Sequence, residues 1–459
     1  MARHTDMWKS ALIHSLLIPA LLGVSAVAQE PARLTLSQAV SIALEKNPIR
    51  KAAMAEERAS QADVSEARSG FMPRITFSEG VNRGNDPVYV FGTRLRQSRF
   101  TATDFALNRL NNPTPISDFV TRFGGQWTLF DSFSSSLNYK RAKQMKDAAT
   151  QQLARADQQT EFRVIEAYYG VLLAGKQVEL AEQTLKTAQA VLDRSKSRVE
   201  SGLAVESDAL TAQVNAAQRQ QDLIQARNGL ALARAQLNTA LGVPSGTNYQ
   251  VAEGLAERTL PTPALDELET AALKQRPDLK QVESQTSAQQ TGVALAKAAF
   301  GPKVNVFGSW EMDNVNFTGN GSNNWVAGAE VQLDLFSGGQ KLARLSHEKA
   351  MLERANAMKQ AAQDNVRLEV QKAYYDHDAA RQMLDVARAS VAQAEESLRI
   401  NQNRYDAGLI TITELLSAED AARASRTNYW QSVYRYETSY AGMEFADGSL
   451  NPQSPVVMK

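Results

Sequence analysis

Hydrophobic positions recur every seven residues over two long stretches of the chain. One series runs from Val164 to Val199 and the other from Val370 to Tyr405, and most positions three residues later are alanine. A large residue at one seam position and a small one at the other let two helix backbones pack closely, as in coiled coils. The spacing predicts two long helices, each turning at a Gly-Leu pair into a shorter returning helix. The predicted helical hairpins span about 134–241, turning near 200–204, and about 340–445, turning near 406–411.

The long helices should reach much further than the helices that return beside them. At 1.5 Å per residue, 134–200 would span ~100 Å, whereas 204–241 would span only ~57 Å. Two further short helices are predicted at 48–70 and 277–299, each with proline at its first turn. We expect each of these short helices to stack end to end with a returning helix, so that the pair matches the long one.

Between the short and the long helices, polar and apolar residues alternate. The alternation predicts four strands, at about 73–82, 119–130, 303–313 and 324–335, each apolar on one face. Their length suits the ~9–11 residues of a tilted membrane strand, although a half-buried hairpin of a soluble protein has the same period. Aromatic residues favour the membrane interpretation, because such side chains gather where a bilayer meets water. The candidate aromatic belt consists of Phe119, Trp127, Trp310 and Trp325.

The same order of elements is written twice. FMPRITF at 71–77 returns as FGPKVNV at 300–306, and EAYYG at 166–170 returns as KAYYD at 372–376. The first copy is longer between its two strands, so we expect an enlarged exposed loop at about 83–118 and a shorter one at 313–324. The predicted organisation is a first repeat over 29–240, a linker over 241–263, a second repeat over 264–446 and a C-terminal tail over 447–459.

Residues 1–28 have the features of a secretory leader. Arg3 and Lys9 precede a mostly apolar stretch, and Ala26-Val27-Ala28 offers a small-x-small cleavage site. We expect export with cleavage after Ala28, and a buried N-terminal helix is the less favoured alternative. No later stretch approaches ~18–20 continuous apolar residues, so contact with a membrane would have to come from strands.

Composition narrows the chemistry. The chain has 459 residues, 43% of them hydrophobic, and its formal net charge is zero, so charge gives no argument for a nucleic acid partner. The absence of cysteine excludes disulfides, thiolate metal sites, thiol nucleophiles and a lipid-modified N-terminal cysteine. His377 occupies a seam position with no second ligand near it, which is typical of packing rather than metal binding. We expect no enzymatic activity, no cofactor and no metal.

Taken together, these features resemble the TolC-like outer membrane efflux proteins. The resemblance covers nearly the whole chain after the leader, and it includes F-x-P motifs at Phe71–Pro73 and Phe300–Pro302 and the two Gly-Leu tips. It implies a mainly α-helical homotrimer whose β-barrel lies in the outer membrane and continues as a long α-helical barrel into the periplasm. Independently, four strands cannot close a barrel in lipid, whereas three copies would supply twelve.

The resemblance also implies how such a duct works. It would be a passive conduit for efflux or type I secretion, joined to a periplasmic adaptor and to an inner membrane pump of the RND, ABC or MFS type. A periplasmic coiled-coil adaptor or scaffold without a membrane barrel is the alternative function. That alternative predicts one helical hairpin between β-rich halves, rather than two hairpins that each follow membrane-like strands.

The family pattern places a gate and a docking surface at the two tips. Its G-L-x-x-x-[ST]-D motif matches the first tip, and its Y-x-x-G motif followed by an acidic segment matches the second. The implied gate residues are Asp208, Glu414, Tyr405 and Ser207, and the implied adaptor-docking residues are Gly202, Leu203, Gly408 and Leu409.

Two positions depart from the family pattern. Ile410 stands where the pattern has a basic residue, and Ser417 stands where it has a second acid, so a salt-bridge lock is not carried over. Helix capping is an equal alternative for Asp208 and Glu414, because acids near a helix N-terminus stabilise the helix without any gating role.

Overall fold

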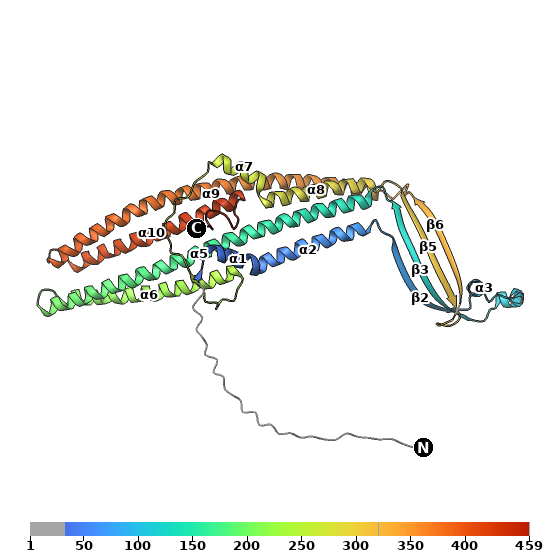
Figure 1. Cartoon of the computed structure of the whole chain (residues 1–459), viewed down its shortest axis with the longest axis horizontal. Helices are drawn as coiled ribbons and strands as arrows, with labels where there is room; N and C mark the ends of the chain where they lie inside the picture. The colour runs from blue at the N-terminus through green and yellow to red at the C-terminus, as the bar shows by residue number, and fades with distance from the viewer. Residues whose placement is uncertain (1–32, 320, 459) are drawn as a thin grey trace, which may run out of the picture.

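The computed structural model describes residues 33–319 and 321–458, so the expected leader and its cleavage site lie outside the described residues. A long column of helices carries a small antiparallel sheet at one end, and the last described residues lie beside the middle of the column (Figure 1). Among the described residues, no helix is both long and apolar enough to cross a membrane.

Six helices form the column, and they fall into three pairs of equal length. α5 and α9 each have 67 residues, α6 and α10 each have 36, and α2 and α8 each have 22. α5 packs against α2 and α6, α9 packs against α8 and α10, and α8 and α10 join the two halves through α5. Their bounds are Ser134–Glu200 for α5, Glu206–Leu241 for α6, Gln340–Asp406 for α9, Ile412–Asp447 for α10, Pro48–Ser69 for α2 and Pro277–Ala298 for α8.

The returning helices meet the short helices end to end, as their lengths predict. Gly242 ends α6 with φ +72°, and a β-carbon there would lie 2.7 Å from Asn47 Cα at the start of α2. The Asn47 amide donates to Ala240 O at 2.9 Å. At the second junction, Arg276 Nη1 donates to Ala446 O at 3.0 Å. At each junction, a side chain therefore donates to a carbonyl oxygen in the last helical turn, where the backbone offers no further N–H partner.

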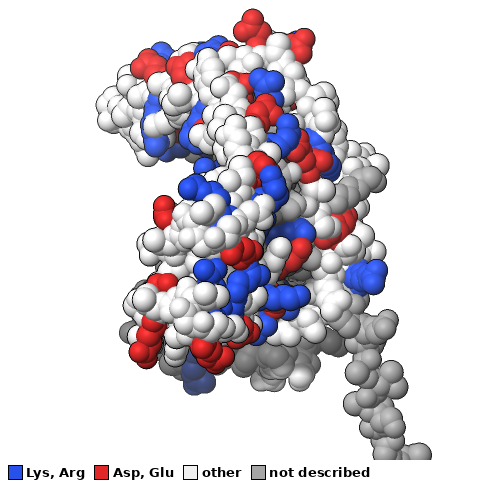
Figure 2. Space-filling view, turned by 90° about the vertical axis from the view of Figure 1, so that its left-hand side faces the viewer, with Lys and Arg blue, Asp and Glu red and all other residues white. Residues whose placement is uncertain are grey.

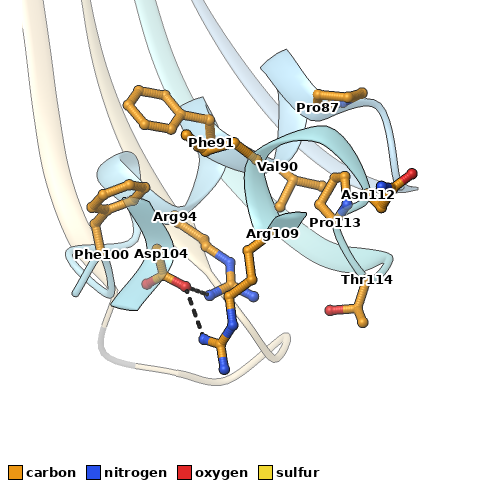
Figure 3. A pocket seen from close by; sticks show the side chains of 11 residues that line it. Pro87, Val90, Phe91, Arg94, Phe100, Asp104, Arg109, Asn112, Pro113 and Thr114 are labelled. Carbon is orange, nitrogen blue, oxygen red and sulfur yellow. Dashed lines mark hydrogen bonds and ion pairs between the residues drawn. The ribbon is translucent and has the colours of Figure 1, made fainter. Parts of the chain in front are cut away.

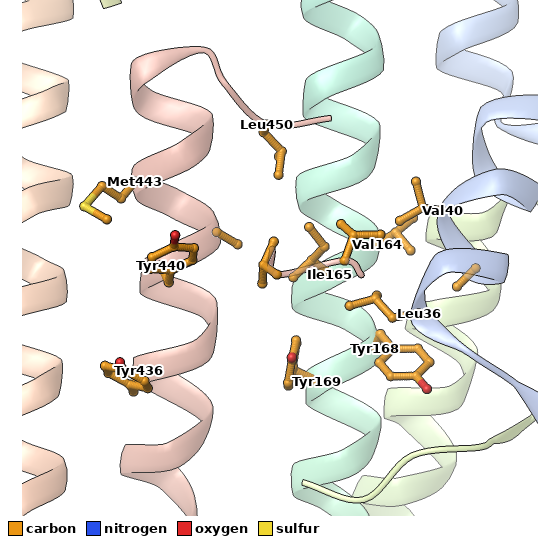
Figure 4. Packing of buried hydrophobic residues seen from close by; sticks show 14 of the residues in the cluster. Leu36, Val40, Val164, Ile165, Tyr168, Tyr169, Tyr436, Tyr440, Met443 and Leu450 are labelled. Carbon is orange, nitrogen blue, oxygen red and sulfur yellow. The ribbon is translucent and has the colours of Figure 1, made fainter. Parts of the chain in front are cut away.

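The main apolar core surrounds these junctions (Figure 4). Two helices that the sequence analysis did not anticipate, α1 (Leu36–Lys46) and α7 (Leu265–Gln275), help to enclose it. Within the linker, β4 (Gln250–Val251) pairs in parallel with β1 (Arg33–Leu34). The tail after α10 also packs inward, with Leu450 and Val456 fully buried.

The sheet has the antiparallel order β2-β3-β5-β6. Its register aligns Phe77, Phe123, Trp310 and Trp325 in one row across all four strands. This row belongs to an exposed apolar face, on which Trp325 is 78% exposed. The strand bounds are Arg74–Gly84 for β2, Ile116–Phe130 for β3, Lys303–Asn314 for β5 and Ser322–Gln332 for β6.

Three expectations about the ends of the sheet need correction. The region 83–118 is not a simple loop, because it contains α3 (Pro87–Arg96), a 3₁₀ turn (Ala102–Phe105) and α4 (Leu107–Asn111). The second loop is shorter than 313–324, since β5 continues to Asn314 and Asp313 is fully buried. β6 ends at Gln332 rather than near 335.

Candidate functional site at the tips of the helical hairpins

Each helical hairpin turns at a glycine in the left-handed region. Gly202 and Gly408 both have φ +71°. At the first tip, Gly202 N donates to Val199 O at 2.9 Å and Leu203 N donates to Arg198 O at 2.8 Å, and the second tip repeats this pattern. This is a Schellman turn, in which glycine avoids the steric cost that a β-carbon would add.

The turn leaves a leucine exposed at each tip. Leu203 is 71% exposed and Leu409 is 70% exposed. Neither leucine contributes to the small apolar cluster behind the tips, which joins the two hairpins. That cluster buries Val191, Ala212, Tyr405, Ile412 and Leu415.

The acids of the two tips have different surroundings. Glu414 completes a capping box with Thr411: the Thr411 backbone N–H donates to Glu414 Oε2 at 2.8 Å, and Glu414 N donates to Thr411 Oγ1 at 3.3 Å. The Thr411 hydroxyl also donates to Glu414 Oε2, at 3.0 Å, and the Thr411 backbone N–H, followed by this hydroxyl, lowers the pKa of Glu414 below its usual range. Asp208 lies in the first turn of α6, and its carboxylate makes no hydrogen bond or ion pair with any described residue, while Ser207 beside it is exposed. Glu414 therefore belongs to a capping box, whereas Asp208 is a first-turn acid that the helix dipole favours.

Tyr405 links the two hairpins. Its side chain is 4% exposed, and its hydroxyl lies 3.2 Å from Ser195 Oγ on α5. Arg198, also on α5, donates from Nη1 to Tyr405 O at 3.0 Å, and its guanidinium lies 5.1 Å from the centre of the tyrosine ring. Ile410 packs against the apolar cluster nearby, so the position where the family pattern has a basic residue serves packing here.

Two ion pairs reinforce this link, and sequence reasoning missed both. Arg194 Nη1 lies 2.6 Å from Asp406 Oδ1, joining α5 to α9. Arg219, whose side chain is 10% exposed, lies 2.8 Å from both Asp222 and Asp420 and so joins α6 to α10. Seen from the tips, charges of both signs interleave over the two lobes, with a hollow between the lobes (Figure 2). In the sequence these residues look like ordinary solvated helix charges, because their pairing depends on how one hairpin lies against the other.

The candidate belt residues occupy different levels of the sheet. Trp310 and Trp325 are direct neighbours on β5 and β6, a few residues from the strand ends farthest from the helices. Trp127 lies near the helical end, where its indole N–H donates to Phe71 O at 2.9 Å. Phe119 lies at the far end, with its ring 6.3 Å from that of Phe317.

Comparison with known proteins identifies the family. The profile of the family described as outer membrane efflux protein matches residues 39–243 and 268–449, which is most of the chain. The chain belongs to the outer membrane efflux protein family. Among curated proteins, it is 25% identical to the alkaline protease secretion protein AprF of Pseudomonas aeruginosa, over 89% of this chain and 83% of AprF. It is 22% identical to the outer membrane protein TolC of Vibrio cholerae, over 91% of each chain.

Solved structures give the same fold. CusC superimposes with a TM-score of 0.77 at 16% identity, over 91% of this chain and 92% of that one. VceC of Vibrio cholerae superimposes with a TM-score of 0.74 at 18% identity, over 90% and 96%. Membership of the outer membrane efflux protein family, rather than these distant structures, makes the chain an outer membrane channel that extends into the periplasm. The alternative of an adaptor without a barrel is not favoured.

Proposed function

We propose that this efflux protein acts as a homotrimer whose three sheets close one twelve-stranded barrel, continued by a long α-helical barrel. The observation that supports this most is the open sheet: β2 and β6 are its two edges, and its apolar face is exposed. Lipid offers no partner to an unpaired strand edge, so each edge needs a strand from another copy. Three copies of a four-stranded sheet give a barrel wide enough for an open lumen.

The apolar face would then contact lipid, and the polar face would line the lumen. In this arrangement Trp310 and Trp325 lie toward the outer interface with Phe119, and Trp127 lies toward the periplasmic interface. Interfacial aromatic residues of this kind set the depth of a barrel in its bilayer.

The hairpin tips would form the periplasmic mouth. In the closed state, Tyr405 and the pairs Arg194–Asp406 and Arg219–Asp420 hold the two hairpins of one protomer together. These ion pairs would connect the two hairpins, in place of the basic residue that the family pattern has at position 410. Asp208, with Ser207 beside it, faces the mouth as the freer acid, while Glu414 contributes charge from within its cap. Acids around a narrow entrance favour the passage of cations.

Leu203 and Leu409 would dock the periplasmic adaptor, with Gly202 and Gly408 shaping the turns that present them. Exposed apolar side chains at the end of a long polar column are suited to a partner surface. The adaptor would connect the duct to an inner membrane pump of the RND, ABC or MFS type, which selects the cargo. The duct itself carries out no chemical reaction.

The trimer is tested by native mass spectrometry of the full-length protein extracted in detergent. We expect the mass of three copies, and gels on which heating converts a slow species to single chains. Recovery of a single-copy species from the soluble periplasm would contradict the proposal.

Docking is tested by replacing both Leu203 and Leu409 with Asp. We expect the variant to keep the trimer and its conductance in planar bilayers but to lose efflux in cells that also produce the adaptor and pump. The matched control replaces Leu210 and Val214, exposed residues of α6 beyond the tip, with Asp. Efflux that survives in the Leu203/Leu409 variant would exclude the tips as docking residues.

A further inference from the structure

The first helix of the insertion between β2 and β3 packs against the end of the sheet. Gln97, directly after α3, donates from Nε2 to Asp118 Oδ1 at 2.9 Å and to Asn314 O at 3.2 Å. Gln97 is 6% exposed and Asp118 is 2% exposed. The end of α3 is therefore anchored to β3 and β5, at the end of the sheet farthest from the helices (Figure 1).

The strand register identifies the face that α3 covers. Arg122 is paired with Ser78 and Glu311, and these positions lie on the face opposite to the apolar row through Phe123. Arg96 of α3 reaches the same carboxylate, with its Nη1 3.4 Å from Glu311 Oε1. α3 consequently lies across the polar face.

Two further observations agree with this placement. A β-carbon at Gly84, which is on the polar face of β2, would lie 3.4 Å from the ring of Tyr89 on α3. A cavity of about 520 Å³ separates α3 from the strands, and Gly92 and Arg96 line it on one side, with Asn82 and Arg122 on the other.

The rest of the insertion holds α3 in place. Asp104, 5% exposed, accepts hydrogen bonds from Thr101 N at 2.9 Å and from Arg94 Nη1 at 2.5 Å, and Arg109 lies 3.6 Å from it (Figure 3). Beside this network the ring of Phe100 packs edge-on against Phe91 and Phe105, with distances of 4.7 and 5.0 Å between the ring centres. The insertion therefore has an aromatic and ionic centre of its own and is a folded unit.

The charged groups that face solvent where α3 meets the strands are arginines, because Asp118 and Asp313 beside them are buried. Arg122 Nε lies 2.7 Å from Glu311 Oε2, so Arg122 and Arg96 share one carboxylate. The two arginine side chains are 50% and 58% exposed, whereas that of Glu311 is 13% exposed. Solvent thus meets two guanidinium groups and little of the acid that balances one of them.

We propose that α3 narrows the outer mouth of the channel and that Arg96 and Arg122 make this constriction selective for anions. The inference rests on the proposed trimer, in which the polar face lines the lumen. Three copies would place six exposed guanidinium groups around the outer mouth, whereas the carboxylates of Glu311, Asp118 and Asp313 on the same face are largely covered. A low-dielectric wall concentrates their field, so chloride and carboxylate solutes are favoured there, in contrast to the acidic periplasmic tips.

Ion selectivity tests the charges. The full-length protein is reconstituted in planar bilayers, and its reversal potential is measured across a KCl gradient. Replacing both Arg96 and Arg122 with Gln should shift the reversal potential toward the potassium equilibrium potential, and Glu311→Gln should shift it toward that of chloride. The control is Arg83→Gln, on the apolar face of β2 beside Ser117, which should leave it unchanged. Equal reversal potentials for the double variant and the wild type would overturn the proposal.

Labelling tests the position of α3 by an independent measurement. The chain lacks cysteine, and a β-carbon at Gly92 would meet nothing within 4 Å, so Gly92→Cys introduces a single thiol without a clash. A charged methanethiosulfonate should lower the conductance of Gly92→Cys and leave that of Leu107→Cys, a 77% exposed position on α4, unchanged.

The two levels of failure are distinguishable. A wild-type protein that forms no channel at all would overturn the trimer and this inference together. A wild-type channel that conducts, with a Gly92→Cys variant that labels without loss of conductance, would overturn only the inference.

Discussion

At the scale of single residues, a substitution at Tyr405 tests the proposed closed state of the tips most directly. Tyr405→Phe keeps the ring in its apolar cluster and the contact with Arg198 but removes the hydroxyl that lies 3.2 Å from Ser195 Oγ. Losing one buried hydrogen bond weakens the closed state by about 1 kcal/mol. We expect a larger single-channel conductance in planar bilayers, because the open tips become more populated. Tyr375→Phe, at a 61% exposed position of α9, is the control. An unchanged conductance in Tyr405→Phe would exclude the hydroxyl from the gate.

A buried acid on α5 makes stability depend on pH. Burial, reinforced by the nearby Asp157, raises the pKa of Glu161 to about 8, above the ordinary value of 4.5. The folded state therefore binds this proton more tightly than the unfolded state, so its contribution to stability is full below about pH 4.5 and is lost as pH rises through 8. The loss is on the order of a few kcal/mol.

Glu161→Gln should remove this contribution to the pH dependence of stability. Thermal unfolding followed by circular dichroism between pH 4.5 and 9 should give a flatter profile for the variant than for the wild type. Glu56→Gln, an exposed acid on α2, should keep the wild-type profile. If Glu161→Gln and the wild type lose stability in parallel, the titrating group lies elsewhere.

At the scale of elements, the two faces of the sheet should respond differently to charge. Phe123 lies in the apolar row between Phe77 and Trp310, whereas Gln126 lies on the polar face, opposite Phe307. A lysine facing lipid near the middle of a bilayer costs ~2–4 kcal/mol, so Phe123→Lys should lower the temperature at which trimers dissociate on gels. Gln126→Lys should leave it nearly unchanged. Equal sensitivity at both positions would reverse or remove the assignment of the lipid face.

How far the sequence predicts each element depends on the length of its periodic pattern. The helix α5 repeats its seam over 67 residues, and its bounds of Ser134–Glu200 match the predicted 134–200. The alternation in β5 similarly locates the strand. By contrast α3 has 10 residues and α4 has 5, too few for a periodic signal to stand out from a polar loop. Such short helices are stabilised by contacts with distant residues, as Gln97 is by Asn314.

At the tips, too, local sequence predicts some features, and others depend on contacts between distant residues. The sequence predicts the glycine turns and singles out Tyr405, because short local motifs specify both. The pairs Arg194–Asp406 and Arg219–Asp420 join residues that are 212 and 201 positions apart in the sequence. Only the packing of one hairpin against the other brings them together. Glu414 was ambiguous because an acid three residues after threonine suits a capping box and a gate equally well.

At the scale of the whole molecule, the sheet and the tips lie at opposite ends of a single column (Figure 1). α5 alone spans ~100 Å at 1.5 Å per residue, a length that separates the two ends by far more than a bilayer. If the sheet lies in the outer membrane as proposed, we expect the insertion to face the exterior and the tips to face the periplasm. The side of the membrane on which the insertion is exposed therefore also fixes the side on which the tips lie.

Single cysteines test this topology, since the native chain has none. A membrane-impermeant maleimide added to intact cells should label Leu107→Cys, which is 77% exposed on α4 of the insertion. The same reagent should label Leu203→Cys, 71% exposed at the first tip, only after the outer membrane is permeabilised. Ala43→Cys, fully buried in the core, should remain unlabelled until the protein is denatured and so reports intact folding. Labelling of Leu203→Cys on intact cells, with Leu107→Cys protected, would mean that the channel is inserted in the opposite direction.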